Sequence, residues 1–341
     1  MRDFFPLLAG NDTLRHRLGE EFSAGSFSHA YIIEGAAGSG KRTLALQLAM
    51  AAACEHRLDA ANPLPCGTCR SCRKIKEGLC PDVITVKRPE DKATMGVDVV
   101  RGIRESVAVV PNDLDVKVYI VEDAHTLTQQ AQNALLLTLE EPPMFVLFLL
   151  LVEDAGLLLE TVRSRAPIFR MQPLARPVLE AQLALIPEAR ALKSSSPAEY
   201  EEVLLLSAGR MGTALALLDA KTRAPLLERR RFAAELIALL ADKKSADLLL
   251  LLQARGSRRD ELIADLSEAE LALRDLTLLS YSERSPLLFF TDRETAADLS
   301  ARFTAARLLT LSAALQETKS ALAANANVKL TVTRLVRRLT L

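Results

Sequence analysis

The stretch His29–Thr43, HAYIIEGAAGSGKRT, decides the fold of the first half of this 341-residue chain. Its apolar part, Tyr31–Glu34, predicts a short buried strand. The residues after the glycines, Arg42–Cys54, predict a helix with Leu44 and Leu48 on one face. A glycine-rich turn between a strand and a helix is the setting of a phosphate-binding loop. The stretch therefore predicts a P-loop at the edge of an α/β sheet.

This loop carries one defect. Lys41 stands where a P-loop lysine reaches the β- and γ-phosphates, but the Ser or Thr that should follow it and hold Mg²⁺ is replaced by Arg42. Thr43 comes one position too late, and a guanidinium cannot ligate a cation. We expect a loop of P-loop shape without MgATP hydrolysis; whether ATP or ADP occupies it stays open, and the alternative is a turn kept for packing. Three glycines would let backbone N–H groups converge on an anion: Gly35, Gly38 and Gly40.

Two acidic residues end the next long apolar strand, Val116–Val121. Glu122 and Asp123 follow it directly, at the edge where ligands bind in open α/β sheets. An ATPase usually has Asp then Glu at this point, so the order here is reversed. Acidic residues at a strand end are often only solvated, and the P-loop upstream is what makes a nucleotide site the favoured interpretation.

The pattern of strands and helices predicts the fold class. Apolar strands alternate with helices, which indicates a parallel sheet covered on both faces. Asp98 is expected to cap one helix, and Thr126 or Thr128 is expected to cap another that runs to about Glu140. The remaining strands are expected at Val83–Val86, Phe145–Val152 and Ala166–Met171.

After Gln172 strand patterns give way to Leu- and Ala-rich helical patterns. We expect three domains: an α/β P-loop domain at residues 1–172, a small helical lid at 173–220 and an all-α domain at 221–341. In the last of these, four leucines are expected on one helix face: Leu308, Leu311, Leu315 and Leu322.

Four clustered cysteines predict a metal site. The two close C-x₂-C steps suit a structural, tetrahedral Zn²⁺ with four thiolate ligands and no catalytic role. The insertion that holds it is expected at about residues 54–80. His56 is a rival ligand to the first cysteine, Cys80 is expected to be an unliganded thiol, and the alternative to a metal is a set of buried free thiols. The four ligands would be Cys54, Cys66, Cys69 and Cys72.

The charge balance and the apolar runs of the sequence indicate which classes of protein to exclude. Lys+Arg and Asp+Glu both number 43, so the net charge argues against a surface that coats nucleic acid throughout, although a local basic patch remains open. We see no secretory signal, and the most apolar run, Met144–Val152, is too short to span a bilayer. We expect a soluble, cytoplasmic protein that does not contact a membrane.

Long strings in the chain resemble one family, the clamp-loader subunits of bacterial DNA polymerase III, which are members of the AAA+ class. The resemblance runs over nearly the whole chain and is densest over residues 1–174. The strings that carry it are HAYIIEGAAGSGK (His29–Lys41), CGTCRSCRKIKEG (Cys66–Gly78), KVYIVEDAHTLTQQAQNALLLTLEEPP (Lys117–Pro143), RSRAPIF (Arg163–Phe169) and NANVKL (Asn325–Leu330).

Departures from the family's motifs favour its delta-prime branch over the ATPase gamma/tau branch. Besides Arg42, Val152 stands where the family's sensor-1 Thr is expected, and Gly212 stands near the sensor-2 Arg position, with Arg210 close by. Ala166 replaces the Cys of the Ser-Arg-Cys motif, but Arg165 remains. Losing the hydrolytic residues while keeping this arginine is the pattern of delta-prime.

The resemblance implies a stator at one end of a five-subunit ring. The chain itself would not be catalytic but would belong to the DNA polymerase holoenzyme, with gamma/tau and delta subunits as partners. Arg165 would act as an arginine finger on a neighbouring subunit's ATP, although a solvated surface charge is the alternative. The complex would load the sliding clamp onto primer–template DNA, and Arg101 and Arg104 are candidates for phosphate contacts, with a solvated helix face as the alternative.

Two other functions stay open. The chain could be an active gamma/tau-like ATPase in which Thr43 or a shifted loop replaces the missing ligand. It could also be a different P-loop enzyme such as a nucleotide kinase, which would leave the cysteine cluster and the helical C-terminal part unexplained.

Overall fold

The computed structural model describes residues 2–89, 92, 94–255, 259–282, 285, 287–324 and 326–340. The chain forms two compact units, one of Met1–Ile186 with Gly209–Thr213 and one of Pro187–Ala208 with Ala214–Leu341. The three-domain division at residues 172 and 220 stays a prediction. Asn325, the first residue of the NANVKL string, lies outside the described residues.

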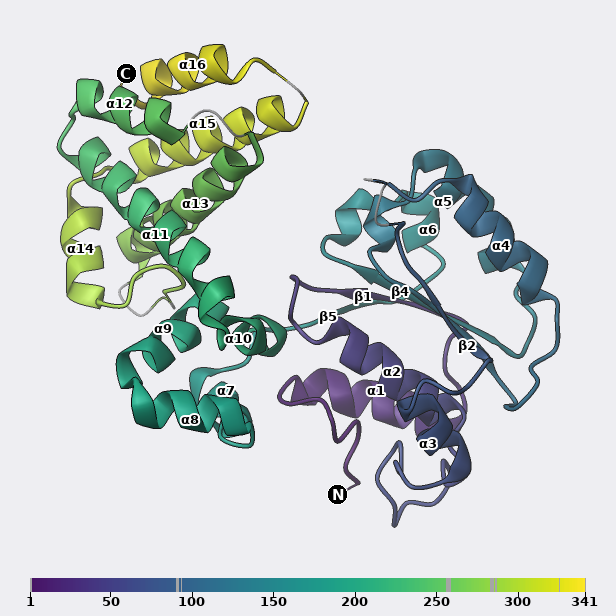
Figure 1. Cartoon of the computed structure of the whole chain (residues 1–341). Coiled ribbons are helices and arrows are strands. Elements are labelled where there is room, and N and C mark those ends of the chain that lie inside the picture. Colours follow the sequence, from purple (N-terminus) through teal and green to yellow (C-terminus); the bar gives the residue numbers. More distant parts are fainter. Residues whose placement is uncertain are drawn as a thin grey trace. The chain divides into compact units, whose positions relative to one another are not determined.

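The first unit contains a five-stranded parallel sheet with the order β2-β3-β4-β1-β5 (Figure 1). The predicted α/β fold class is therefore confirmed. Each expected strand is present within two residues of its predicted ends. The strands are β1 (Ala30–Glu34), β2 (Val83–Val86), β3 (Lys117–Val121), β4 (Val146–Val152) and β5 (Ile168–Arg170).

Successive side chains of the central strands point to opposite faces of the sheet, and each face has its own core. On one face, Ile33 and Leu149 pack with Leu44 and Leu48 from the helix after the glycine-rich loop. On the other face, the strands pack against α4 and α5 (Figure 1). Fully apolar strands are stable here because helices exclude water from both faces.

The first unit contains seven α-helices and two short 3₁₀ helices within the described residues. One prediction about them was wrong: Asp98 does not cap the helix that carries Arg101 and Arg104, because Gly96 holds the cap position and Asp98 lies in the first turn. Thr128, one of the two expected caps of α5, accepts a hydrogen bond from the Ala131 N–H. These elements are α1 (Asp12–Ala24), α2 (Lys41–Ala52), α3 (Arg70–Lys76), α4 (Val97–Val107), η1 (Ala124–Thr126), α5 (Gln129–Glu140), η2 (Ala155–Leu157), α6 (Glu160–Arg163) and α7 (Arg176–Leu183).

The described part of the second unit is helical, as the Leu- and Ala-rich patterns predicted. The four leucines expected on one face of α15 are all buried in its core. No helix in the described ranges is both long and apolar enough to span a membrane. The helices are α8 (Pro187–Ser195), α9 (Pro197–Ser207), α11 (Ala220–Ala241), α12 (Ser245–Arg255), α13 (Arg259–Tyr281), α14 (Arg293–Ala301), α15 (Ala305–Ala323) and α16 (Val328–Thr340), while α10 (Met211–Leu217) has residues in both units.

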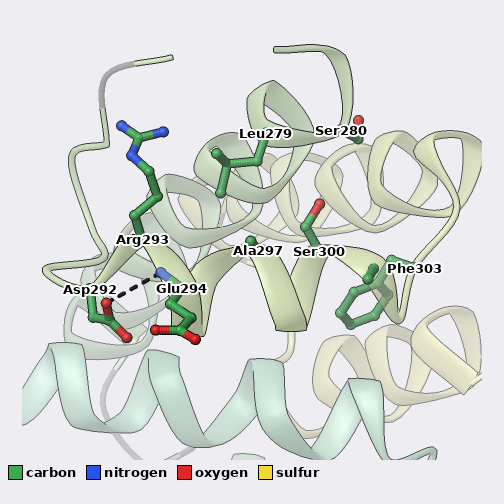
Figure 2. A pocket seen from close by; sticks show the side chains of 9 residues that line it. Leu279, Ser280, Asp292, Arg293, Glu294, Ala297, Ser300 and Phe303 are labelled. Carbon is green, nitrogen blue, oxygen red and sulfur yellow. Dashed lines mark hydrogen bonds between the residues drawn. The ribbon is translucent and has the colours of Figure 1, made fainter. Parts of the chain in front are cut away.

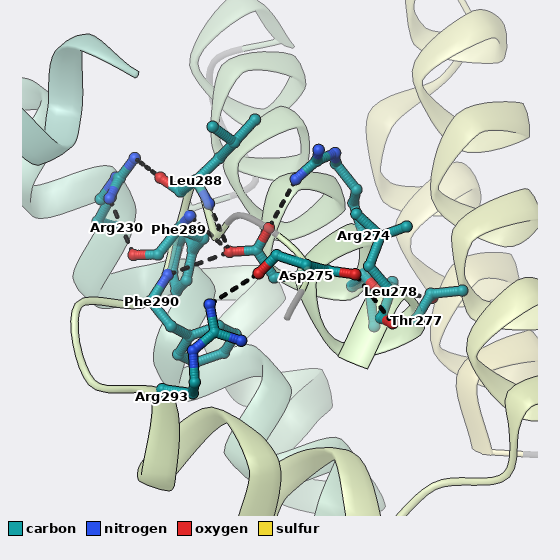
Figure 3. Close-up of polar contacts among 11 residues, drawn as sticks. Arg230, Arg274, Asp275, Thr277, Leu278, Leu288, Phe289, Phe290 and Arg293 are labelled. Carbon is teal, nitrogen blue, oxygen red and sulfur yellow. Dashed lines mark hydrogen bonds and ion pairs between the residues drawn. The ribbon is translucent and has the colours of Figure 1, made fainter. Parts of the chain in front are cut away.

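A buried carboxylate organises the loop between α13 and α14 (Figure 3). Asp275 is fully buried, and its Oδ2 accepts hydrogen bonds from the backbone N–H groups of Leu288, Phe289 and Phe290 at 2.8, 2.7 and 3.3 Å. Arg230 donates to the carbonyls of Leu288 and Phe289 at 2.8 and 3.0 Å. This loop therefore obtains from side chains the hydrogen bonds that a helix would supply internally.

Candidate functional site

The glycine-rich loop joins β1 to α2 at the carboxyl edge of the sheet. Gly38 and Gly40 have φ values of 76° and 96°, in the left-handed region that glycine adopts without strain. The N–H of Gly35 donates to the Val152 carbonyl at the end of the neighbouring β4, at 3.0 Å. The residues predicted to form a phosphate loop thus lie together at this edge, and their binding of a phosphate stays a prediction.

The lysine of the loop is turned onto the loop's own backbone. Lys41 Nζ donates to the carbonyls of Gly35 and Ala36 at 2.5 and 3.1 Å. Burial lowers the pKa of Lys41, and the carboxylates of Glu153 and Asp123 oppose this shift. The ammonium therefore lies within the loop, where it would meet a phosphate.

Arg42, at the position where a P-loop has its metal-binding hydroxyl, forms an ion pair with Glu122. Its Nε lies 3.2 Å from Glu122 Oε1, and Lys87 Nζ lies 3.9 Å from Glu122 Oε2. The Glu122 side chain is 21% exposed and the Arg42 side chain 69% exposed. The acidic residue predicted for the nucleotide site is therefore paired with two cations of the chain itself. Thr43, one residue later, is exposed on the first turn of α2.

Asp123 and Val152 lie at the same edge of the sheet. Asp123 has a φ of 51° and precedes η1, and its carbonyl accepts from both the N–H and the hydroxyl of Thr126 at 2.8 Å. Val152, in the position expected for a polar sensor, is fully buried at the end of β4. An apolar side chain there cannot orient a water molecule or contact a phosphate by hydrogen bonding.

The segment Gly209–Thr213 returns to the loop. The N–H of Gly212 donates to the Gly38 carbonyl at 2.9 Å, and the Thr213 hydroxyl donates to the Ala37 carbonyl at 3.4 Å. A Cβ on Gly38 would lie 2.4 Å from the Thr213 Oγ1, so only glycine fits this contact. The backbone at the expected sensor-2 position is therefore fixed directly on the phosphate loop.

Arg165 lies just after α6 and is held on two sides. Its Nη1 donates to the Thr161 carbonyl at 2.8 Å and to the Ser164 hydroxyl at 3.3 Å, and its Nη2 forms an ion pair with the Glu140 carboxylate. The side chain is 33% exposed, so it is neither buried nor freely solvated. The finger predicted from the sequence is ordered within its own chain.

The elements that carry this arginine are joined by a residue that the sequence analysis did not single out. Gln132, on α5, is buried; its Nε2 donates to the Leu127 carbonyl at 3.0 Å and its Oε1 accepts from the Leu159 N–H at 2.7 Å. Leu159 holds the cap position of α6. The only signal in the sequence was a polar residue on the apolar face of a predicted helix.

The four predicted cysteine ligands converge in space. Their sulfur atoms all lie within 4.8 Å of one another, all four side chains are buried and none forms a disulfide. Sulfurs placed about 2.3 Å from a tetrahedral Zn²⁺ lie about 3.8 Å apart, and Cys66 Sγ and Cys72 Sγ are 3.9 Å apart. The donor set and spacing fit a metal such as zinc. The rival His56 and the separate Cys80 are not part of this cluster.

The pKa values of two thiols in the cluster shift in opposite directions: that of Cys66 is lowered, and that of Cys72 is raised. Burial raises the pKa of Cys66, but hydrogen bonds from Cys69 and Thr68 outweigh it and lower the value to about 6. For Cys72, burial and the neighbouring sulfurs of Cys69 and Cys54 raise the pKa. Four thiolates in one buried site would repel one another, and a bound cation would offset this repulsion.

The two arginines proposed for DNA lie on the solvent side of α4. Arg101 Nη1 is 3.2 Å from Asp98 Oδ1, and both side chains are well exposed. Arg104 is exposed one turn further on, beside the acidic Glu105. Since acidic neighbours accompany both, the phosphate-contact role stays a prediction.

A cavity of about 770 Å³ lies in the second unit, between α14 and the end of α13, and none of the sequence-predicted site residues lines it (Figure 2). Asp292, at its rim, accepts from the N–H groups of Glu294 and Thr295 at 3.2 and 2.9 Å. Its acidic side chain therefore caps α14.

Residues 10–175 match the family model described as DNA polymerase III, delta subunit. The chain is 33% identical over 215 residues to DNA polymerase III subunit tau of Bacillus subtilis, covering 63% of this chain and 37% of that protein. It is 36% identical over 203 residues to subunit delta' of Escherichia coli, covering 60% of this chain and 58% of that protein. The matches thus span about a third to three fifths of these two relatives' own lengths.

Among solved structures, a DNA polymerase III gamma subunit-related protein of Thermotoga maritima aligns with 95% of this chain and 98% of its own, at 18% identity and a TM-score of 0.44. The parallel sheet, the glycine-rich loop and the sequence matches over residues 10–175 agree with one another. Over residues 10–175 the chain is therefore similar to the clamp-loader subunits of DNA polymerase III.

Proposed function

We propose that this chain is a delta-prime-like subunit that supports ATP-dependent loading of a sliding clamp onto primer–template DNA without hydrolysing ATP itself. Its partners would be the gamma/tau and delta subunits of the loader. The relatives named delta', tau and gamma are all similar to it, so the proposal rests on the residues of this chain's own site.

The Arg42–Glu122 ion pair carries this proposal. A P-loop ATPase holds Mg²⁺ between a hydroxyl after the lysine and an acidic strand end. Here the hydroxyl is missing, and a permanently charged guanidinium already neutralises the carboxylate, so a divalent cation would meet a positive charge where it needs oxygen ligands. The apolar Val152 removes a further polar group from the same edge.

Arg165 supports the second half of the proposal, a contribution to a neighbour's reaction. An arginine supplied in trans stabilises the charge that develops on a transferred phosphoryl group, and such fingers contribute roughly 10³–10⁵ in rate. Arg165 is partly exposed, and its backbone follows directly on α6. The cysteine cluster would hold a structural zinc ion, which would order the surrounding insertion when bound.

An active gamma/tau-like ATPase is the second candidate. The observation in its favour is the preserved loop: the left-handed glycines and a lysine that lies within it. This candidate requires Mg²⁺ to displace Arg42 from Glu122.

Mg²⁺-dependent ATP turnover separates the two. We expect the isolated chain to show no more turnover than Lys41→Ala, and we expect it to raise turnover when it is assembled with a gamma/tau subunit. Arg165→Ala should remove this gain without preventing assembly, which size-exclusion chromatography measures. Robust turnover by the chain alone that Lys41→Ala abolishes would favour the second candidate.

A further inference from the structure

The Arg165 guanidinium is held by a carboxylate from a distant part of the chain. Glu140 is the last residue of α5, and 25 residues separate it from Arg165. The ion pair joins their side chains on one side of the guanidinium, while the Thr161 carbonyl accepts from Nη1 on the other. The side chain is therefore fixed between two elements.

Both elements are themselves anchored. The α5 helix begins with a cap at Thr128, and its buried Gln132 bonds to the backbone at the start of α6. The N–H of Arg165 donates to the Val162 carbonyl at 3.2 Å. Glu140 and Arg165 thus approach each other from backbone positions that packing has already set.

The contacts with Thr161, Ser164 and Glu140 leave part of the Arg165 guanidinium available for another ligand. Among the described residues, its hydrogen bonds engage Nη1 twice and Nη2 once, so the Nε–H has no partner there. Nε and Nη2 lie on one edge of the group, and because Nη2 already binds Glu140, the Nε–H is the donor on that edge that remains for a phosphate oxygen.

We propose that Glu140 is a positioning residue for Arg165, which orders the guanidinium so that its Nε–H edge meets a phosphate on a neighbouring subunit. This inference rests on the proposed function, because it assigns a role in the trans reaction. Glu140 does not contact the reacting atoms.

The negative charge of Glu140 also weakens the attraction between Arg165 and a phosphate. The exposure of the two side chains decides whether this effect or the ordering of the guanidinium is larger. The two side chains are 33% and 42% exposed, so water screens the attraction and little of the positive charge is cancelled. Ordering a long side chain in advance, in contrast, removes an entropic cost that would otherwise fall in the transition state. Glu140 should therefore help the partner's hydrolysis.

The test compares Glu140→Ala with Glu141→Ala in the full chain, assembled with a gamma/tau subunit. The control removes the same charge one residue away, and no ion pair of the described chain involves Glu141. We expect Glu140→Ala to lower kcat for the partner's ATP hydrolysis about three- to tenfold with KM unchanged, since immobilising one such side chain is worth about that factor. Glu141→Ala should leave both constants at the wild-type values.

Arg165→Ala and the double variant complete the design. Arg165→Ala should lower kcat far more, and adding Glu140→Ala to it should change nothing further, because a positioning residue has no effect without the group it positions. The melting temperatures of all variants should agree, whereas a purely structural role of Glu140 would lower the melting temperature of Glu140→Ala.

The outcomes distinguish the two proposals. If Arg165→Ala leaves hydrolysis unchanged, the finger and with it the role of Glu140 are wrong. If Arg165→Ala is inactive but Glu140→Ala matches Glu141→Ala or hydrolyses faster than wild type, the finger stands and the positioning role is overturned.

Discussion

At the scale of single residues, Arg42 is the departure from a P-loop on which the proposed lack of hydrolysis mainly depends. Arg42 does not merely omit a hydroxyl, because its guanidinium pairs with Glu122, the residue that would otherwise attract a cation. Lys87 adds a second positive charge to the same carboxylate. Two positive charges of the chain thus lie beside the carboxylate that a cation would otherwise approach.

Replacing this arginine should restore a metal requirement. We expect Arg42→Thr to raise the affinity for a Mg²⁺-bound, non-hydrolysable ATP analogue by roughly tenfold or more, because the Thr hydroxyl would supply an oxygen ligand and the guanidinium charge would no longer repel the ion. Fluorescence titration with Mg²⁺ and with EDTA measures this change. Arg101→Thr, the same substitution on α4, should have no effect, and Mg²⁺-dependent binding by the wild-type chain would contradict the argument.

Sequence reasoning identified the residues of this edge but not their partners. Strand ends are visible as the ends of apolar runs, so the glycines, Lys41 and Glu122 could all be placed at one edge. Pairing across the fold depends on side-chain directions, and no pattern indicated that Lys87 would reach Glu122 or that Glu140 would reach Arg165. The cysteines were easier, because three of the four ligands lie within seven residues of one another.

At the scale of elements, the strands were predictable and helix starts were less so. A buried parallel strand is a continuous apolar run with sharp ends, and each observed strand lies within its predicted range or extends it by one residue. A helix start depends on which residue caps it. Asp98 has a typical capping side chain, yet the helix begins one residue earlier, after Gly96.

The insertion around α3 should depend on a metal. We expect about one Zn²⁺ per chain by elemental analysis, with loss of the metal in Cys69→Ser and retention in Cys80→Ser, which alters a buried thiol outside the cluster. Because Cys80 lies outside the cluster, zinc that is lost only in Cys69→Ser is lost through removal of a ligand. A preparation that folds fully with no metal would contradict this expectation.

The same site should release its metal in acid. Thiolates bind the ion and thiols do not, so protons compete with it and affinity falls as the pH falls. Cys66, whose pKa is lowered to about 6 without metal, should lose its proton readily, whereas the raised pKa of Cys72 makes its ionisation depend on the metal's charge. A colorimetric zinc chelator should report release as the pH is lowered from about 8 to about 5.

At the scale of the whole molecule, the chain has two units with separate cores. The two faces of the sheet supply the core of the first unit, and leucines of α11, α13, α15 and α16 supply that of the second. A change in composition at Gln172 indicated where strands end. It could not indicate that Gly209–Thr213 return to the first unit, because the Leu174–Gly209 and Gly38–Gly212 hydrogen bonds join residues far apart in sequence.

Two cores predict two separable unfolding transitions. Asp275→Ala leaves three backbone N–H groups in the second unit without their acceptor, at a cost of roughly 3 kcal/mol. For a unit of this size that corresponds to about 6–12 °C in the melting temperature. Removing the metal should instead lower the transition of the first unit. Differential scanning calorimetry should show each change moving one transition only, with the exposed Asp298→Ala as control, whereas a single transition moved by both changes would mean that the units unfold together.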